Sequence, residues 1–202
     1  MSRRLDLSLY LVTDTVLCGQ RGVPETVRAA IAGGVTVVQL RDPAATTRQL
    51  YEAALALRAV VGEVPLIVND RLDVALAAGA DGVHLGQADL PVHKAREIAG
   101  DDFIIGWSVS TADEVDRAAD VDYLGIGPIF PTATKPDAGA ALGPAFVREL
   151  AARSTLPTVA IGGITADNAA QVDGVHGICA VSAICAAADP RAAAESLRKA
   201  HP

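Results

Sequence analysis

The chain of 202 residues is 50% apolar and carries a formal net charge of −7, with an isoelectric point near 5.0. This acidic balance argues against a nucleic-acid backbone or an anionic membrane as a partner, because both need a basic face. Aromatic residues make up 3% of the chain, too few for a platform on which bases stack. A phosphorylated small molecule needs only a few local cations and stays compatible with these numbers.

The chain is expected to be a cytoplasmic protein of one domain, residues 1–202. Its three cysteines, Cys18, Cys179 and Cys185, have no metal-ligand spacing, and an odd number favours a reducing compartment. Asp6 interrupts the short apolar run at the N-terminus, and no small-residue cleavage site follows it. No apolar run approaches the roughly 20 residues of a membrane helix. Apolar helix faces serve a barrel wall and a subunit interface alike, so a homo-oligomer stays possible.

Short apolar, β-branched runs alternate with alanine-rich amphipathic stretches along the whole chain. The runs predict eight strands, in the order LSLYLV, VTVVQL, PLIVN, GVHLG, FIIGWS, YLGIG, PTVAIGG and GICAVSA. Helices are predicted between them, for example at residues 46–62 and 144–154. Continuous apolar strands are typical of a parallel sheet covered on both faces.

About eight βα units are the number that closes a (β/α)₈ TIM barrel, an α/β fold. The alternative is an open, doubly wound sheet, which usually has a glycine-rich first turn. The first turn here reads VTDTVLCGQRG and has no G-x-G-x-x-G pattern. The pattern therefore favours the barrel.

Polar residues or glycines follow nearly every predicted strand, and in a barrel these positions meet at one rim. In chain order they are Thr13 and Asp14, Gln39 and Arg41, Asn69 and Asp70, Gln87 and Asp89, Ser108, the Thr132, Thr134 and Lys135 loop, Gly162 and Gly163, and Val181 and Ser182. Loops begin at strand ends, which explains single polar positions. The start of a loop does not readily explain why cations, carboxylates and amides recur at the ends of so many strands.

The rim residues suggest two anion sites. Asp70 and Asp89 are oxygen ligands suited to Mg²⁺, which takes one or two carboxylates together with phosphate oxygens. Arg41 and Lys135 could hold the same polyphosphate. The alternative for each aspartate is a helix N-cap, before RLDVALAAG and LPVHKAREI respectively.

The second anion site is predicted from AIGGI and AVSAI, because loops after strands seven and eight of such barrels often bind phosphate through backbone N–H groups. Thr132, Thr134 and Asp137 complete the loop after strand six. His84 lies within an apolar strand and is expected in the core. The histidines at 93, 176 and 201 are expected in solvent.

The chain resembles the thiamine phosphate synthase family along almost its whole length. The matching stretches are YLVTD, VVQLRD, IVNDRLDVALAAGADGVHLGQADL, GWSVST, DYLGIGPIFPTATKPDA, AIGGI and AVSAI, in the order and spacing of the family. The combination of NDR, GVHLGQ-D and GPIF-T-TK is specific to it.

The resemblance implies a transferase of thiamine biosynthesis that joins hydroxymethylpyrimidine diphosphate to thiazole phosphate. The products are thiamine phosphate and pyrophosphate, and in the family a pyrimidine methyl cation forms before the thiazole nitrogen traps it. By position, the residues implied to hold pyrophosphate are Gln39, Arg41, Asn69 and Lys135, those for Mg²⁺ are Asp70 and Asp89, and those for thiazole phosphate are Thr132, Thr134, Gly163, Val181 and Ser182. Ser108 is placed by the pyrimidine, and Arg41, Lys135 and Ser108 are the expected catalytic residues.

One position departs from the family. Its second-strand motif reads Q-L/V-R-x-K, whereas this chain has QLRDP, with Pro43 in place of the lysine. Losing a charge-assisted hydrogen bond of roughly 1.5–3 kcal/mol could cost about ten- to a hundredfold in rate. Two alternatives therefore stay open: a thiazole tautomerase, whose branch has histidine near Pro128, and a non-catalytic paralogue that binds thiazole or thiamine phosphate.

Overall fold

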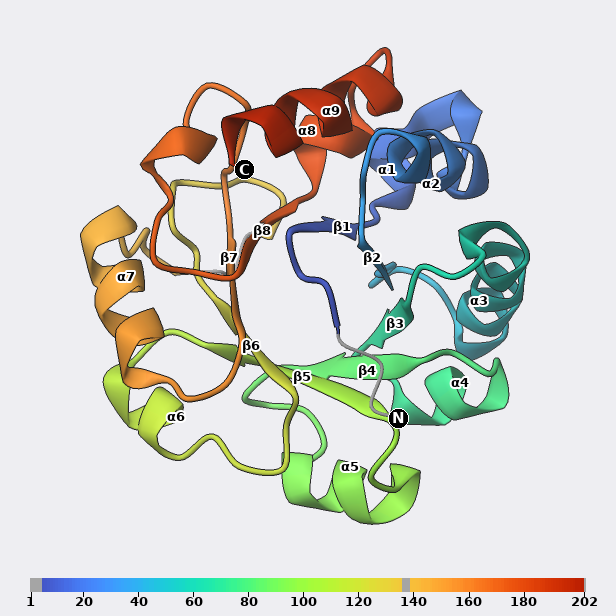
Figure 1. Cartoon of the computed structure of the whole chain (residues 1–202). Coiled ribbons are helices and arrows are strands. Elements are labelled where there is room, and N and C mark those ends of the chain that lie inside the picture. Colours follow the sequence, from blue (N-terminus) through green and yellow to red (C-terminus); the bar gives the residue numbers. More distant parts are fainter. Residues whose placement is uncertain (1–4, 136–138, 202) are drawn as a thin grey trace.

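The computed structural model describes residues 5–135 and 139–201, so Asp137 lies outside the described residues. Eight parallel strands close into a barrel in chain order (Figure 1). They are β1 (Leu9–Val12), β2 (Val37–Leu40), β3 (Leu66–Asn69), β4 (Gly82–Leu85), β5 (Ile104–Val109), β6 (Tyr123–Ile126), β7 (Thr158–Ile161) and β8 (Gly177–Ala180). The predicted (β/α)₈ barrel is confirmed. Seven of the predicted runs contain a whole strand, whereas β5 extends one residue beyond FIIGWS, to Val109.

Helices surround the barrel and shield its outer surface (Figure 1). The α-helices are α1 (Thr15–Cys18), α2 (Val23–Ala32), α3 (Thr47–Val61), α4 (Leu72–Ala77), α5 (Val92–Ala99), α6 (Ala112–Asp116), α7 (Pro144–Arg153), α8 (Ser182–Cys185) and α9 (Pro190–Ala200). Two 3₁₀ helices, η1 (Gly19–Arg21) and η2 (Ala169–Gln171), lie in the connections. The start of α3 is fixed by a capping box, in which Thr46 and Gln49 exchange side-chain to backbone hydrogen bonds. No described helix is long and apolar enough to cross a membrane.

Side chains alternate between two cores because successive residues of a strand point to opposite faces. Along β2, Val38 and Leu40 pack with the helices, whereas Val37 joins the smaller cluster inside the barrel. Tyr10 and Tyr123 are the largest side chains of that inner cluster and are almost fully buried.

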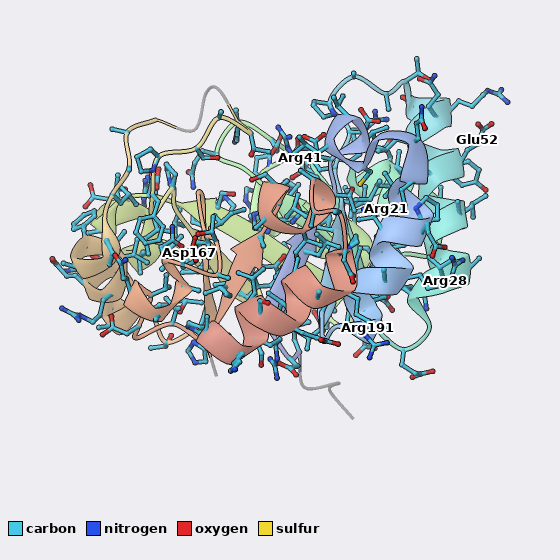
Figure 2. All side chains as sticks on the ribbon, turned by 90° about the horizontal axis from the view of Figure 1, so that it is seen from above. Arg21, Arg28, Arg41, Glu52, Asp167 and Arg191 are labelled. Carbon is cyan, nitrogen blue, oxygen red and sulfur yellow. The ribbon has the colours of Figure 1, made fainter. Side chains whose placement is uncertain are left out.

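The carboxyl ends of the strands form one rim, where the candidate residues lie. The end of β1 is tied to the end of β2, because the Arg41 backbone N–H donates to the Thr13 hydroxyl at 3.1 Å. Figure 2, turned by 90° from Figure 1, shows Arg41 at the upper edge of the barrel, whereas Arg28 and Arg191 lie on the outer helices.

Candidate active site

A cavity of about 800 Å³ opens at the rim and reaches into the barrel. All twelve residues predicted for the site line it: Gln39, Arg41, Asn69, Asp70, Asp89, Ser108, Thr132, Thr134, Lys135, Gly163, Val181 and Ser182. They come from seven strand ends, so the structure brings together residues that lie far apart in the sequence. A volume of this size is in the range of small-molecule sites.

The two aspartates face each other across the cavity wall, and neither caps a helix. The residue at the N-cap of α4 is Arg71 and that of α5 is Pro91, with no side-chain cap bond at either. Asp70 instead adopts a left-handed backbone with φ of 62°, a conformation that non-glycine residues rarely take. Asp89 accepts a hydrogen bond from the Gly86 backbone N–H at 2.6 Å.

The surroundings of Asp70 disfavour the charged form of its carboxyl group. Partial burial and then the neighbouring Asp89 carboxyl raise the pKa of Asp70 from 3.8 to about 6, against the opposing effect of Lys135 and Arg41. Two carboxyl groups this close disfavour double ionisation unless a cation lies between them. The described residues contain no group of three or more His, Cys, Asp or Glu that could hold a metal. The pair therefore fits Mg²⁺ only where ligand oxygens complete the shell.

The raised pKa of Asp70 predicts that Asp70→Asn stabilises the folded protein at alkaline pH. Since the folded pKa lies above that of an unfolded aspartate, ionising Asp70 costs stability as the pH rises from about 4 to 6. Without divalent cations, the variant is expected to melt at a higher temperature than the parent protein at pH 8. The difference should vanish below about pH 4, where the carboxyl is protonated in both states. Thermal melts in EDTA at both pH values check this, and an equal or lower melting temperature of the variant at pH 8 would contradict it.

The loop after β6 is held against the end of β7. The backbone N–H groups of Ile129 and Phe130 donate to the carbonyls of Ile161 and Gly162 at 2.8 and 3.0 Å. Gly163 has φ of 65°, and a Cβ there would collide with the Phe130 side chain and the Pro131 carbonyl. Glycine is thus required for this close approach.

The same loop also lines a second hollow of about 470 Å³. Both are lined by Thr132, Thr134, Gly163 and Ser182, whereas Arg41, Asp70 and Lys135 line the main cavity only. Lys135 is exposed and follows Thr134 directly in the loop. The geometry therefore offers one polar region near the carboxylates and another near the glycine pair.

Three side chains deeper in the barrel were not predicted for the site. Tyr10 and His84 line the cavity, and Tyr123 lies directly behind them. The expectation of a core position for His84 is only half correct, since its ring lies inside the barrel but reaches the cavity and contacts Ser108. Burial, and then Lys135, lower the pKa of His84 to about 4. The glycines within FIIGWS and YLGIG were the available signal, because a glycine inside a strand often marks a close approach.

Comparison with known proteins gives the family. A model of the family described as thiamine monophosphate synthase matches residues 9–184. The chain belongs to the thiamine monophosphate synthase family. A relative named thiamine-phosphate synthase from Psychrobacter sp. is 50% identical over 199 residues, which cover 95% of this chain and 93% of that protein. One of the same name from Azorhizobium caulinodans is 51% identical over 204 residues, covering 98% and 96%.

A solved structure of a thiamine phosphate pyrophosphorylase from Pyrococcus furiosus has a TM-score of 0.88 and 43% identity, covering 98% of this chain and 96% of that chain. A 3-hexulose-6-phosphate synthase structure at 18% identity has a TM-score of 0.74 and shows the shared barrel fold alone.

The departure from the family motif lies in the site itself. Pro43 lines the cavity, on the same side as Arg41. Arg48 is exposed in the first turn of α3 and does not line the cavity. The carboxylate of Asp42 turns instead toward α1, where it accepts a hydrogen bond from the Thr15 hydroxyl at 2.8 Å.

Proposed function

We propose that this protein is a thiamine-phosphate synthase that joins hydroxymethylpyrimidine diphosphate to thiazole phosphate and releases pyrophosphate. The supporting observation is that every residue predicted to bind the substrates or a metal lines one cavity. Its close relatives bear the same enzyme name over almost their full length.

The pyrophosphate of the first substrate is proposed to bind at the side of β2 and β3. Arg41 and Lys135 supply positive charge, and Gln39 and Asn69 supply amide donors. Asp70 and Asp89 would hold Mg²⁺, because two crowded carboxylates need a cation. When bound, this ion would supply positive charge to the leaving pyrophosphate.

The proposed chemistry is dissociative and needs no strong base. The bond from the pyrimidine methylene carbon to the diphosphate oxygen breaks first, with the electron pair leaving on pyrophosphate. Arg41 and Lys135 stabilise that developing charge. The thiazole nitrogen then donates its lone pair to the cation, and Ser108 helps to hold the pyrimidine ring in line.

The thiazole phosphate is proposed to bind in the same cavity, between the loop after β6 and the ends of β7 and β8. Thr132 and Thr134 offer hydroxyl donors there. The backbone N–H groups of Gly163, Val181 and Ser182 are the expected further donors. Lys135 follows Thr134 directly in this loop, so one cation is proposed to serve the leaving group next to the acceptor.

The enzyme is proposed to work in the cytoplasm on these small molecules. This proposal is supported by its three cysteines, which are buried free thiols of the kind that a reducing compartment preserves.

Product analysis tests the proposed function. The purified protein is incubated with both substrates and, separately, with thiazole phosphate or thiazole carboxylate phosphate alone. Thiamine phosphate and pyrophosphate in equal amounts are expected from the pair. Isomerisation of the thiazole carboxylate without the pyrimidine diphosphate would identify a tautomerase instead. Binding of thiazole phosphate without any product would identify a non-catalytic binding protein.

Restoring the family lysine is expected to strengthen the pyrophosphate site. Pro43→Lys adds a cation to the cavity wall beside Arg41, and one charge-assisted hydrogen bond corresponds to about a tenfold lower KM for the pyrimidine diphosphate. Ala44→Lys is the matched control, since Ala44 is exposed and does not line the cavity. Equal KM values in both variants would show that Pro43 does not face the pyrophosphate.

A further inference from the structure

Five side chains form a continuous line of hydrogen bonds beneath the cavity, and we call it the relay. Gln39 Nε2 donates to the Tyr10 hydroxyl at 2.9 Å, and the two tyrosine oxygens are 2.7 Å apart. The Tyr123 hydroxyl lies 3.0 Å from His84 Nδ1, and His84 Nε2 lies 2.9 Å from Ser108 Oγ. Both ends of the relay, Gln39 and Ser108, are proposed substrate contacts. The three residues between them have no role in the mechanism above.

The barrel makes room for the relay with two glycines. Gly106 of β5 pairs with His84 on one side and with Tyr123 on the other, so these three residues share one level. A Cβ at Gly106 would collide with the Tyr123 ring and with His84 Nδ1. A Cβ at Gly125 would lie 3.1 Å from His84 Cε1. The missing side chains let the two rings meet, with their centroids 5.5 Å apart.

The number of hydrogens that each side chain can donate decides which group is the donor in each hydrogen bond of the relay. Each tyrosine hydroxyl has one hydrogen to donate. The Tyr10 hydroxyl accepts from the Gln39 amide, and Tyr123 is the only acceptor that the described residues offer to its own hydrogen. Because a buried O–H needs an acceptor, Tyr10 donates to Tyr123, and the Tyr123 hydrogen is left for His84 Nδ1. A ring nitrogen that accepts carries no hydrogen, so His84 bears its proton on Nε2.

His84 Nε2–H therefore donates to Ser108 Oγ. The serine oxygen receives a hydrogen from inside the barrel, and its own hydrogen is left for the cavity that Ser108 lines.

We propose that Tyr10, Tyr123 and His84 are positioning residues that hold the Ser108 hydroxyl as a hydrogen-bond donor toward the substrate. The site then selects a ring that presents an unprotonated acceptor, such as a pyrimidine nitrogen, to Ser108. The identity of that ring rests on the proposed function, whereas the proton position on His84 does not. A relay running the other way would leave Ser108 as an acceptor and select a ring amino group instead.

The histidine tautomer tests the direction in the free protein, without turnover. In protein labelled with ¹⁵N at histidine, the two ring nitrogens of His84 report which of them carries the proton, and His84→Asn assigns the signals among four histidines. The expected form is neutral with the proton on Nε2. A proton on Nδ1, or rapid exchange between both forms, overturns the proposal even if the protein makes thiamine phosphate.

The KM values for the two substrates test whether the relay orients Ser108 toward the pyrimidine. Tyr123→Phe removes one hydroxyl, so Ser108 loses its fixed orientation, and KM for the pyrimidine diphosphate should rise about tenfold. KM for thiazole phosphate should stay unchanged. Tyr51→Phe is the matched control, because Tyr51 lies on α3 away from the cavity. Tyr10→Phe should have a smaller effect, since Tyr123 can still donate to His84.

Equal KM values for the pyrimidine diphosphate in Tyr123→Phe and Tyr51→Phe would overturn the proposal. If Tyr123→Phe does not fold, the tautomer of the parent protein still decides it. Failure of the parent protein to form product would count against the proposed function alone, because the tautomer measurement needs no substrate.

Discussion

Replacing Lys135 with methionine is expected to lower kcat/KM for thiamine phosphate formation by about 10²–10³-fold, the loss typical of one preorganised group that stabilises transition-state charge. The Lys135 side chain lines the cavity with Arg41 and the two aspartates, where the pyrophosphate is proposed to leave. Methionine keeps most of the length and removes the charge. Initial rates with both substrates varied give the comparison.

The matched control is Lys94→Met. Lys94 is an exposed residue of α5 that pairs with Glu97 on the same helix, outside the cavity. Its kinetic constants should equal those of the parent protein. If Lys135→Met retained more than about a tenth of the parent activity, the role of Lys135 in stabilising the leaving group would be wrong.

Asp70→Asn is expected to raise the Mg²⁺ concentration needed for half-maximal activity and to lower the rate at saturating Mg²⁺. Even an outer-shell partner of a metal ligand is worth about 10–100-fold in metal affinity, and a direct ligand should cost at least as much. Asp89→Asn should have an effect of the same direction, because the two carboxyls form one site. A Mg²⁺ titration of the initial rate measures both.

Asp102→Asn serves as the control for the aspartates, since Asp102 is exposed in the turn before β5 and does not line the cavity. Combined with the stability prediction, Asp70→Asn should give a protein that is more stable in EDTA at pH 8 and less active with Mg²⁺. A variant with unchanged Mg²⁺ dependence would show that Asp70 is not a metal ligand.

The barrel architecture was predictable because it depends on the pattern of apolar and amphipathic segments along the sequence. Eight apolar runs alternate with helical stretches, and parallel strands place their carboxyl ends at one rim. The convergence of Gln39, Asp70 and Lys135 on one cavity follows from that rim alone.

Interior contacts were harder to predict. Nothing in the local sequence of Tyr10 or Tyr123 indicates a partner 113 positions away. Their meeting depends on the barrel register, and on Gly106 leaving space between His84 and Tyr123. The N-cap alternative for Asp70 was equally open, because the left-handed backbone that turns it into the cavity depends on tertiary contacts.

The cavity is proposed to join two phosphorylated substrates by a metal-assisted departure of pyrophosphate. The most direct measurement is the formation of thiamine phosphate and pyrophosphate by the purified protein, stripped with EDTA and then titrated with Mg²⁺. Both products are expected in equal amounts, with a rate that rises from near zero as Mg²⁺ is added. Full activity in EDTA would contradict the metal site, and no product from a folded protein that binds thiazole phosphate would contradict the synthase assignment.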